Sequence, residues 1–124
     1  MPFLVITGRV QHGNKRGKPL GFPTINIPMP ATIEKDQWGI YFSIVKIGGK
    51  FYPGATHLGP VKAFNPWKKT CETYLLTFHQ DLYDEEVEKR LLFKFREIES
   101  FSSIQALKKQ IKKDIKQAKK FFGL

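Results

Sequence analysis

Apolar and β-branched residues recur over the first hundred positions in short runs that predict β-strands. Glycine, proline or aspartate separates most of the runs. The Gly48-Gly49 pair is typical of a two-residue hairpin, so the run after it should pair antiparallel with the run before it. Pro53 and Gly54 interrupt that later run, which indicates an edge strand or a bulge. The predicted strands cover residues 3–11, 23–27, 38–47, 50–58, 71–78 and 87–98; residues 12–22 and 59–70 are predicted loops, and 81–84 a turn.

The end of the chain follows a helical period instead. Apolar residues spaced by three and four form one stripe and predict a helix over 103–122. Ser102 and Gln105 fit a capping box at its start, and Gly123 is a plausible stop. Strands followed by one helix predict a mainly β fold, a small antiparallel barrel of five or six strands with the helix packed on it. The stripe consists of Ile104, Leu107, Ile111, Ile115, Ala118 and Phe122.

Length and composition favour one cytoplasmic domain. The chain has 124 residues, 41% of them apolar, which suits a single core. We expect the barrel to occupy about 2–98 and the helix to close it. No run approaches the roughly 18–20 apolar residues that span a bilayer. The apolar start, residues 1–7, is too short for a signal peptide. Cys71 is the only cysteine, so an internal disulfide is excluded. We expect a monomer with no membrane partner.

The net charge of +10 favours anionic partners. Its distribution weakens the case for nucleic acid, because seven lysines gather on the predicted helix against one acid, Asp114. A lysine run on a helix is most often a solvated face, so we do not expect a nucleic-acid partner. A basic nucleic-acid-binding barrel stays open as an alternative, although it predicts cations interleaved with aromatic residues on exposed strands. The lysines are Lys108, Lys109, Lys112, Lys113, Lys116, Lys119 and Lys120.

The segment from 13 to 26 combines glycines and cations in a way that suits phosphate. Gly13, Gly17 and Gly21 recur every four residues and let the backbone approach a ligand. Lys18 lies among them, with two further cations. The segment matches neither a P-loop nor a dinucleotide-binding fingerprint. A glycine-rich hairpin loop with solvated lysines explains the same pattern.

Thr24 and Asn26 form a possible metal site. In an extended segment they point to one side and Ile25 to the other. Two neutral oxygen ligands suit Mg²⁺, which keeps several waters and takes other oxygens from substrate phosphates. The alternative is a strand edge that carries two turn-forming polar residues.

Glu72 is a candidate general base. It is the only charged residue in the run 71–78, and it shares a strand face with Tyr74 and Leu76. A carboxylate on a mostly apolar strand is costly to bury without a partner. Desolvation is also what makes a carboxylate basic enough to take a proton near neutral pH. An exposed glutamate opposite a lysine of a neighbouring strand is the alternative.

Taken together, these segments resemble the riboflavin kinase family. The order G-x-V-x-x-G-x-x-x-G-K-x-L-G-F-P-T-x-N, from Gly8 to Asn26, is similar to the opening signature of that family. The strand that begins Cys71-Glu72-Thr73-Tyr74 resembles the one that holds its catalytic glutamate. Further similar segments are Trp38-Gly39-Ile40-Tyr41, Tyr52-Pro53-Gly54-Ala55, Phe95-Arg96 and Phe101-Ser102-Ser103-Ile104.

The resemblance implies a six-stranded antiparallel barrel that transfers a phosphoryl group from ATP, with Mg²⁺, to riboflavin, giving FMN and ADP. By this resemblance Thr24 and Asn26 hold the metal and Thr24 also contacts phosphate. Glu72 accepts the proton of the ribityl hydroxyl. Arg96 and Phe101 lie near the flavin. The backbone at the three loop glycines, together with a lysine side chain, lines the nucleotide phosphates, which assigns Gly13, Gly17, Gly21 and Lys18 to that role.

Two departures from the family pattern leave an alternative open. The family often has N-I-G or S-I-G where this chain has Thr56-His57-Leu58-Gly59, and residues 60–65 do not match its common R-P-T-F-G. A flavin- or nucleotide-binding module without turnover would fit that change. The intact Thr24, Asn26 and Glu72 favour an enzyme. The adenylyltransferase domain of many bacterial relatives is absent from the sequence, so we expect the product to be FMN.

Overall fold

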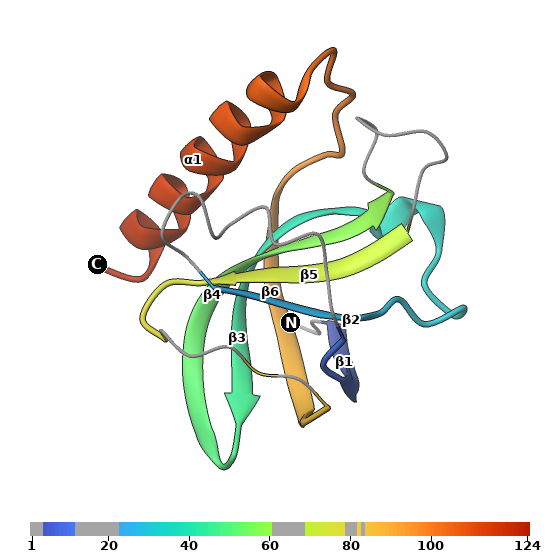
Figure 1. Ribbon diagram of the computed structural model, residues 1–124, viewed down its shortest axis with the longest axis vertical. Helices are drawn as coiled ribbons and strands as arrows, with labels where there is room; N and C mark the ends of the chain where they lie inside the picture. The colour runs from blue at the N-terminus through green and yellow to red at the C-terminus, as the bar shows by residue number, and fades with distance from the viewer. Residues whose placement is uncertain (1–3, 12–22, 61–68, 79–81, 83) are drawn as a thin grey trace.

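In the part of the chain that the computed structural model describes, six strands precede one long helix (Figure 1). The structure describes residues 4–11, 23–60, 69–78, 82 and 84–124. A short 3-10 helix, η2 (Lys35–Gln37), precedes β3. The strands are β1 (Leu4–Arg9), β2 (Thr24–Pro28), β3 (Gly39–Ile47), β4 (Lys50–Pro60), β5 (Lys69–Leu75) and β6 (Glu86–Arg96), and the helix is α1 (Ile104–Phe121).

The strands form one antiparallel sheet that curls toward closure. Its order is β1-β6-β3-β4-β5-β2, and each neighbouring pair is antiparallel. The two edges meet just after β1, where the Gln11 amide donates to the Asn26 carbonyl oxygen at 2.7 Å. The mainly β fold with one C-terminal helix is therefore confirmed.

Each face of the curled sheet buries its own apolar cluster. The concave inner face carries residues such as Ile25, Val45 and Leu91, which have almost no solvent exposure. On the outer face α1 packs against Phe42, Ala55 and Tyr74, and Figure 1 shows the helix lying alongside β4 and β5. The alternation of side chains along each strand feeds both clusters. The site described below lies between the outer face and the helix.

The β3–β4 hairpin turns at Gly48 and Gly49, as predicted. Their φ angles of 56° and 84° lie in the left-handed region that glycine adopts without strain. The expectation that Pro53 and Gly54 indicate an edge or a bulge is wrong for the strand as a whole. β4 lies between β3 and β5, in continuous register with β3. The proline fits because β5 pairing begins only at Gly54, so its missing N–H leaves no strand bond unmade.

Several boundaries differ from the predicted ones. The loop predicted over 59–70 is shorter, because β4 continues to Pro60 and β5 begins at Lys69. The predicted loop 12–22 and most of the predicted turn 81–84 lie outside the described residues. Among the described residues no helix has the length and hydropathy needed to cross a bilayer.

The helix begins one residue later than its predicted cap. Ser103, not Ser102, is the N-cap, and its hydroxyl oxygen accepts a hydrogen bond from the Ala106 amide at 3.1 Å. The third helical position is therefore Ala106, so the predicted capping box with Gln105 does not form. Gly123, at φ 74°, follows the end of the helix as predicted.

Candidate active site

One row of cross-strand partners carries the site. Antiparallel register pairs Asn26 with Glu72, Glu72 with His57, His57 with Ile40, and Ile40 with Arg96. Directly paired residues project to the same face of a sheet, with Cβ atoms about 4.5–5.5 Å apart. Residues from five strands therefore line up on the outer face. Thr24 lies two positions before Asn26 in β2 and shares that face.

Glu72 is buried beside a tyrosine hydroxyl. Only 1% of the residue is exposed, and Tyr74, itself 5% exposed, donates its hydroxyl proton to Oε1 of Glu72 at 3.1 Å. Tyr74 is paired with Thr24 across the β2–β5 ladder, so the hydroxyl, carboxylate and amide residues gather at one place. The predicted shared face of Glu72 and Tyr74 is confirmed, and the alternative of an exposed surface glutamate is wrong.

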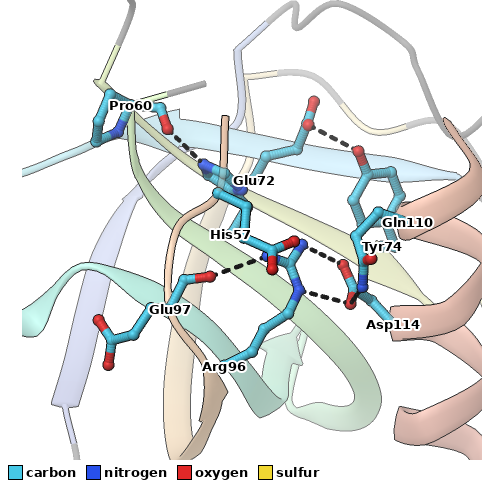
Figure 2. A network of polar contacts seen from close by, with 9 residues as sticks. His57, Pro60, Glu72, Tyr74, Arg96, Glu97, Gln110 and Asp114 are labelled. Carbon is cyan, nitrogen blue, oxygen red and sulfur yellow. Dashed lines mark hydrogen bonds and ion pairs between the residues drawn. The ribbon is translucent and has the colours of Figure 1, made fainter. Parts of the chain in front are cut away.

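The helix closes the site through an ion pair with β6. Figure 2 shows the Arg96 guanidinium facing Asp114 of α1. The pair is bidentate, with Nε to Oδ1 at 2.8 Å and Nη2 to Oδ2 at 2.7 Å. Gln110, one turn earlier, donates to Oδ1 of Asp114 at 3.0 Å, and Nη1 of Arg96 donates to the Glu97 carbonyl. Because the guanidinium is planar and binds both carboxylate oxygens, this ion pair fixes the distance and angle between α1 and β6, which together form one wall of the site.

A narrow pocket lies between this wall and the sheet. His57 lines it from β4, and Nε2 of its ring donates to the Pro60 carbonyl at 3.0 Å. That bond fixes the ring and assigns a proton to Nε2, since a carbonyl oxygen only accepts. The full lining is Ile40, Ala55, His57, Tyr74, Arg96, Leu107, Ile111 and Asp114.

A lysine lies on the inner face, beneath the same two strands. Lys89 of β6 has no solvent exposure, and its ammonium donates to the carbonyl oxygens of Ile25 at 2.6 Å and Cys71 at 2.8 Å. Burial lowers the pKa of Lys89, while Cys71 and Glu72 oppose that shift. Burial also raises the pKa of the Cys71 thiol, an effect that Lys89 opposes.

The structure brings together part of the predicted site. Asn26 is paired with Glu72, and Thr24 is paired with Tyr74 two positions along the same face. Arg96 lies on the far side of the same row, and Phe101 is half-buried against the helix–sheet cluster. The predicted phosphate-binding residues Gly13, Gly17, Lys18 and Gly21 lie outside the described residues.

Three side chains near the site carried no predicted role. His57 stood out in the sequence only as part of a departure from the family pattern. Asp114 is the one acid on a lysine-rich helix, which is a usable indication that it faces a partner. Lys89 lies in the run Glu-Lys-Arg, which is typical of a solvated strand, and nothing in the sequence marks it as buried.

Comparison with known proteins identifies the family of the chain. The family model described as Flavokinase: Riboflavin kinase matches residues 3–122. This chain belongs to the riboflavin kinase family. The match spans both the barrel strands and the helix, including the strand pair that carries Asn26 and Glu72.

Several bacterial relatives belong to the same family. The chain is 39% identical over 122 residues to an RNA-binding riboflavin kinase, RibR, of Bacillus subtilis, covering 97% of this chain and 52% of that protein. It is 35% identical over 124 residues to the bifunctional riboflavin kinase/FMN adenylyltransferase of Escherichia coli, covering 99% of this chain and 39% of the enzyme. The chain thus spans about half, or less, of the curated relatives that it matches.

Solved structures share the fold. A riboflavin kinase from Trypanosoma brucei aligns over 96% of this chain and 79% of its own, with a TM-score of 0.55 and 27% identity. A Streptococcus pneumoniae chain described as a macrolide-efflux protein aligns over 94% of this chain and 38% of its own, with a TM-score of 0.74 and 29% identity. Both likenesses cover the strands and the helix of this chain.

Proposed function

We propose that this chain is a riboflavin kinase domain, which transfers the γ-phosphoryl group of ATP to the ribityl 5′-hydroxyl of riboflavin and releases FMN and ADP. The observation that carries the proposal is the pairing of a buried carboxylate, Glu72, with an oxygen ligand, Asn26, across the β2–β5 ladder. Phosphoryl transfer needs an oriented hydroxyl and neutralised phosphate charge more than covalent chemistry. The pairing therefore places a carboxylate that can orient the hydroxyl beside an oxygen ligand for a charge-neutralising metal ion.

Glu72 serves as the general base in this proposal. Its carboxylate accepts the hydroxyl proton as the ribityl oxygen bonds to the γ-phosphorus and the bond to the ADP oxygen breaks. The Tyr74 hydroxyl, which donates to Oε1, holds the carboxylate in one orientation. General-base assistance of this kind contributes roughly 10²–10⁴-fold to a rate.

The donor set at the β2 edge fits a magnesium ion. Thr24 and Asn26 are half-buried neutral oxygen donors on the face of Glu72, and Mg²⁺ prefers oxygen ligands while keeping water and phosphate oxygens in its shell. We assign Thr24 and Asn26 as its protein ligands, with Thr24 also next to phosphate. A bound magnesium ion would neutralise charge on the transferring phosphoryl group.

The nucleotide and flavin sites complete the assignment. Gly13, Gly17, Lys18 and Gly21 are proposed to line the phosphates of ATP, as the family signature implies. For the flavin, the pocket against α1 offers apolar walls and the Arg96–Asp114 pair. Because the Arg96 donors engage Asp114 and Glu97, Arg96 would shape the wall of the flavin site, and Phe101 would lie at its margin.

One assay tests the proposed activity. The protein is incubated with riboflavin, ATP and Mg²⁺, and the flavins are separated by chromatography. Steady formation of FMN with an equal amount of ADP is the expected result. Binding of riboflavin and ATP without FMN would instead show the non-catalytic binding module, which the changed segment at 56–65 left open.

A second candidate function concerns the outer face of α1. Its acid, Asp114, is buried and paired with Arg96, so the solvent face carries lysines without an opposing acid on the helix. Lys109, Lys112, Lys116 and Lys120 are all exposed and follow one another at one-turn spacing. A relative is described as RNA-binding. Contrary to the expectation from the sequence, we propose that this face binds RNA alongside the kinase activity.

Salt dependence tests the second candidate. The affinity for a single-stranded RNA should fall steeply with salt, with a log–log slope of about −0.7 for each phosphate contact. Replacing the four lysines with glutamine should flatten that slope while FMN formation stays unchanged. An equally weak, salt-insensitive affinity in both proteins would exclude RNA binding by this face.

A further inference from the structure

Lys89 is a buried cation that the proposed reaction does not use. It projects from β6 into the inner apolar cluster and is 0% exposed. Its neighbours in the register are Ile6 of β1 and Val45 of β3, both buried. The amine crosses the curled sheet and reaches the opposite pair of strands, β2 and β5.

An ammonium group is a costly choice at this position. Moving a charge out of water carries a penalty that two hydrogen bonds to neutral carbonyls offset only in part. An apolar side chain of similar length would avoid the penalty and pack against the same neighbours. A buried charge of this kind therefore calls for a role that an apolar residue would not fill.

The two carbonyl groups that hold the ammonium flank the proposed active-site residues. Ile25 lies between Thr24 and Asn26, and Cys71 immediately precedes Glu72. Backbone atoms of β2 and β5 are thus bound from the inner face, while the side chains of Asn26 and Glu72 project from the outer face. The ammonium spans the ladder at the point where these two side chains meet.

The position of β2 gives this contact its importance. β2 is the last strand of the sheet order, bound on one side by β5. On its other side the described residues meet it through the bridge from Gln11 to Asn26. A charge-assisted bond is roughly twice as strong as a neutral one, so Lys89 is a substantial part of what fixes this edge strand.

We propose that Lys89 is a positioning residue, which holds β2 against β5 from inside the barrel and thereby sets Thr24 and Asn26 relative to Glu72. This inference rests on the proposed kinase function for its effect on activity. Its structural half, the fixing of β2, stands without that function. Lys89 touches neither substrate nor metal in this account.

The test replaces Lys89 with methionine, which keeps an unbranched side chain only one atom shorter and removes both the charge and the donor. We expect faster hydrogen exchange of the β2 backbone amides and an affinity for magnesium-ADP that is about 10-fold lower or more. The thermal midpoint should stay the same or rise, because the desolvation penalty is removed. Riboflavin affinity should hold, and kcat should fall. A merely structural lysine would move the midpoint and the affinities together.

Lys94→Met is the matched control. Lys94 lies on the same strand and also donates to two carbonyl oxygens, of Asp36 at 3.0 Å and Trp38 at 3.2 Å. Those carbonyls lie just before β3 and belong to neither β2 nor β5, so this variant should leave magnesium-ADP affinity and β2 exchange unchanged. Equal changes in both variants would show that the loss of any lysine–carbonyl bond on β6 has the same effect, and would overturn the proposal.

The outcomes separate the two claims. Wild-type protein that makes no FMN contradicts the kinase function, while the exchange measurement still tests Lys89. Wild-type protein that makes FMN, with a Lys89→Met variant that matches it in β2 exchange and magnesium-ADP affinity, overturns the positioning role. If the methionine variant does not fold, Lys89→Gln, which keeps a donor but is one atom shorter and uncharged, is measured against the same expectations.

Discussion

Glu72 and Lys89 show how far a single residue can be interpreted from sequence. Glu72 is the only charge in an apolar run, so the sequence marked it as a candidate for burial and for the role of general base, and the structure shows that it is buried. Lys89 is flanked by Glu88 and Arg90 and has the local pattern of a solvated strand. Only the register of β6 shows that alternate residues of that run face the inner cluster. The local sequence pattern identifies a buried charge when its sequence neighbours are apolar. It does not identify one whose neighbours are themselves charged.

Asn26→Ala tests the metal assignment at the residue scale. Removing the amide oxygen should lower activity by at least about 10–100-fold, the usual cost of a lost metal-site interaction. The thermal midpoint should change little, because the side chain is only half-buried. Thr24→Ser, which keeps the hydroxyl oxygen, is the control and should retain most of the activity. Near-normal FMN formation by Asn26→Ala would exclude the amide as a magnesium ligand.

The buried ammonium predicts a pH dependence of stability. Burial lowers the folded-state pKa of Lys89 below its ordinary 10.5, so between those two values the unfolded chain binds more protons. The free energy of unfolding contributed by Lys89 therefore rises with pH in that window. Urea unfolding of wild type and Lys89→Met should show the advantage of the variant shrinking as pH rises toward 10.5. If the difference in free energy of unfolding between Lys89→Met and wild type stayed constant as the pH rose toward 10.5, burial would not lower the pKa of Lys89.

At the scale of elements, the helix was the best-predicted part of the chain. Its three- and four-residue period identified the buried Leu107, Ile111, Ile115 and Ala118. The period failed for Asp114, which is 5% exposed on the same stripe, because its reason for burial is Arg96 on a distant strand. The first predicted stripe residue, Ile104, is the first residue of the helix and is 41% exposed.

A pair of substitutions tests the face assigned to α1. Ile111→Asp places an unpaired charge at a position that is 4% exposed and should lower the free energy of unfolding by at least about 3 kcal/mol. Lys112→Gln, on the adjacent exposed position, should change it by less than about 0.5 kcal/mol. Urea denaturation of both variants gives the comparison. Similar losses from the two changes would mean that the helix is rotated from the orientation described.

β4 shows where element-level reasoning stops. Proline and glycine in a strand favour an edge, yet β4 is interior, and Pro53 fits because its neighbour β5 ends beside it. The sequence alone does not show that β5 ends beside Pro53, because that depends on the order and register of the strands. The Gly48-Gly49 turn, whose geometry is local, was predicted in full.

The whole molecule assembles its site from residues that are far apart in sequence. Asn26, His57, Glu72 and Arg96 come from four strands, and Asp114 comes from the helix. Periodicity predicted the strands and the fold class but not the register that puts these residues in one row. The resemblance to riboflavin kinases supplied Asn26, Glu72 and Arg96 as a set. It did not supply Lys89, which is not among the residues that the signature marks.

The turnover of Glu72→Gln tests the central claim most directly. Glutamine keeps the size of the side chain and an oxygen that accepts the Tyr74 hydroxyl proton, but it lacks the basicity of a carboxylate. If Glu72 takes the ribityl proton, kcat for FMN formation should fall by roughly 10²-fold or more, while riboflavin affinity and the thermal midpoint stay close to those of wild type. An unchanged kcat in this folded, riboflavin-binding variant would contradict the assignment of Glu72 as the base.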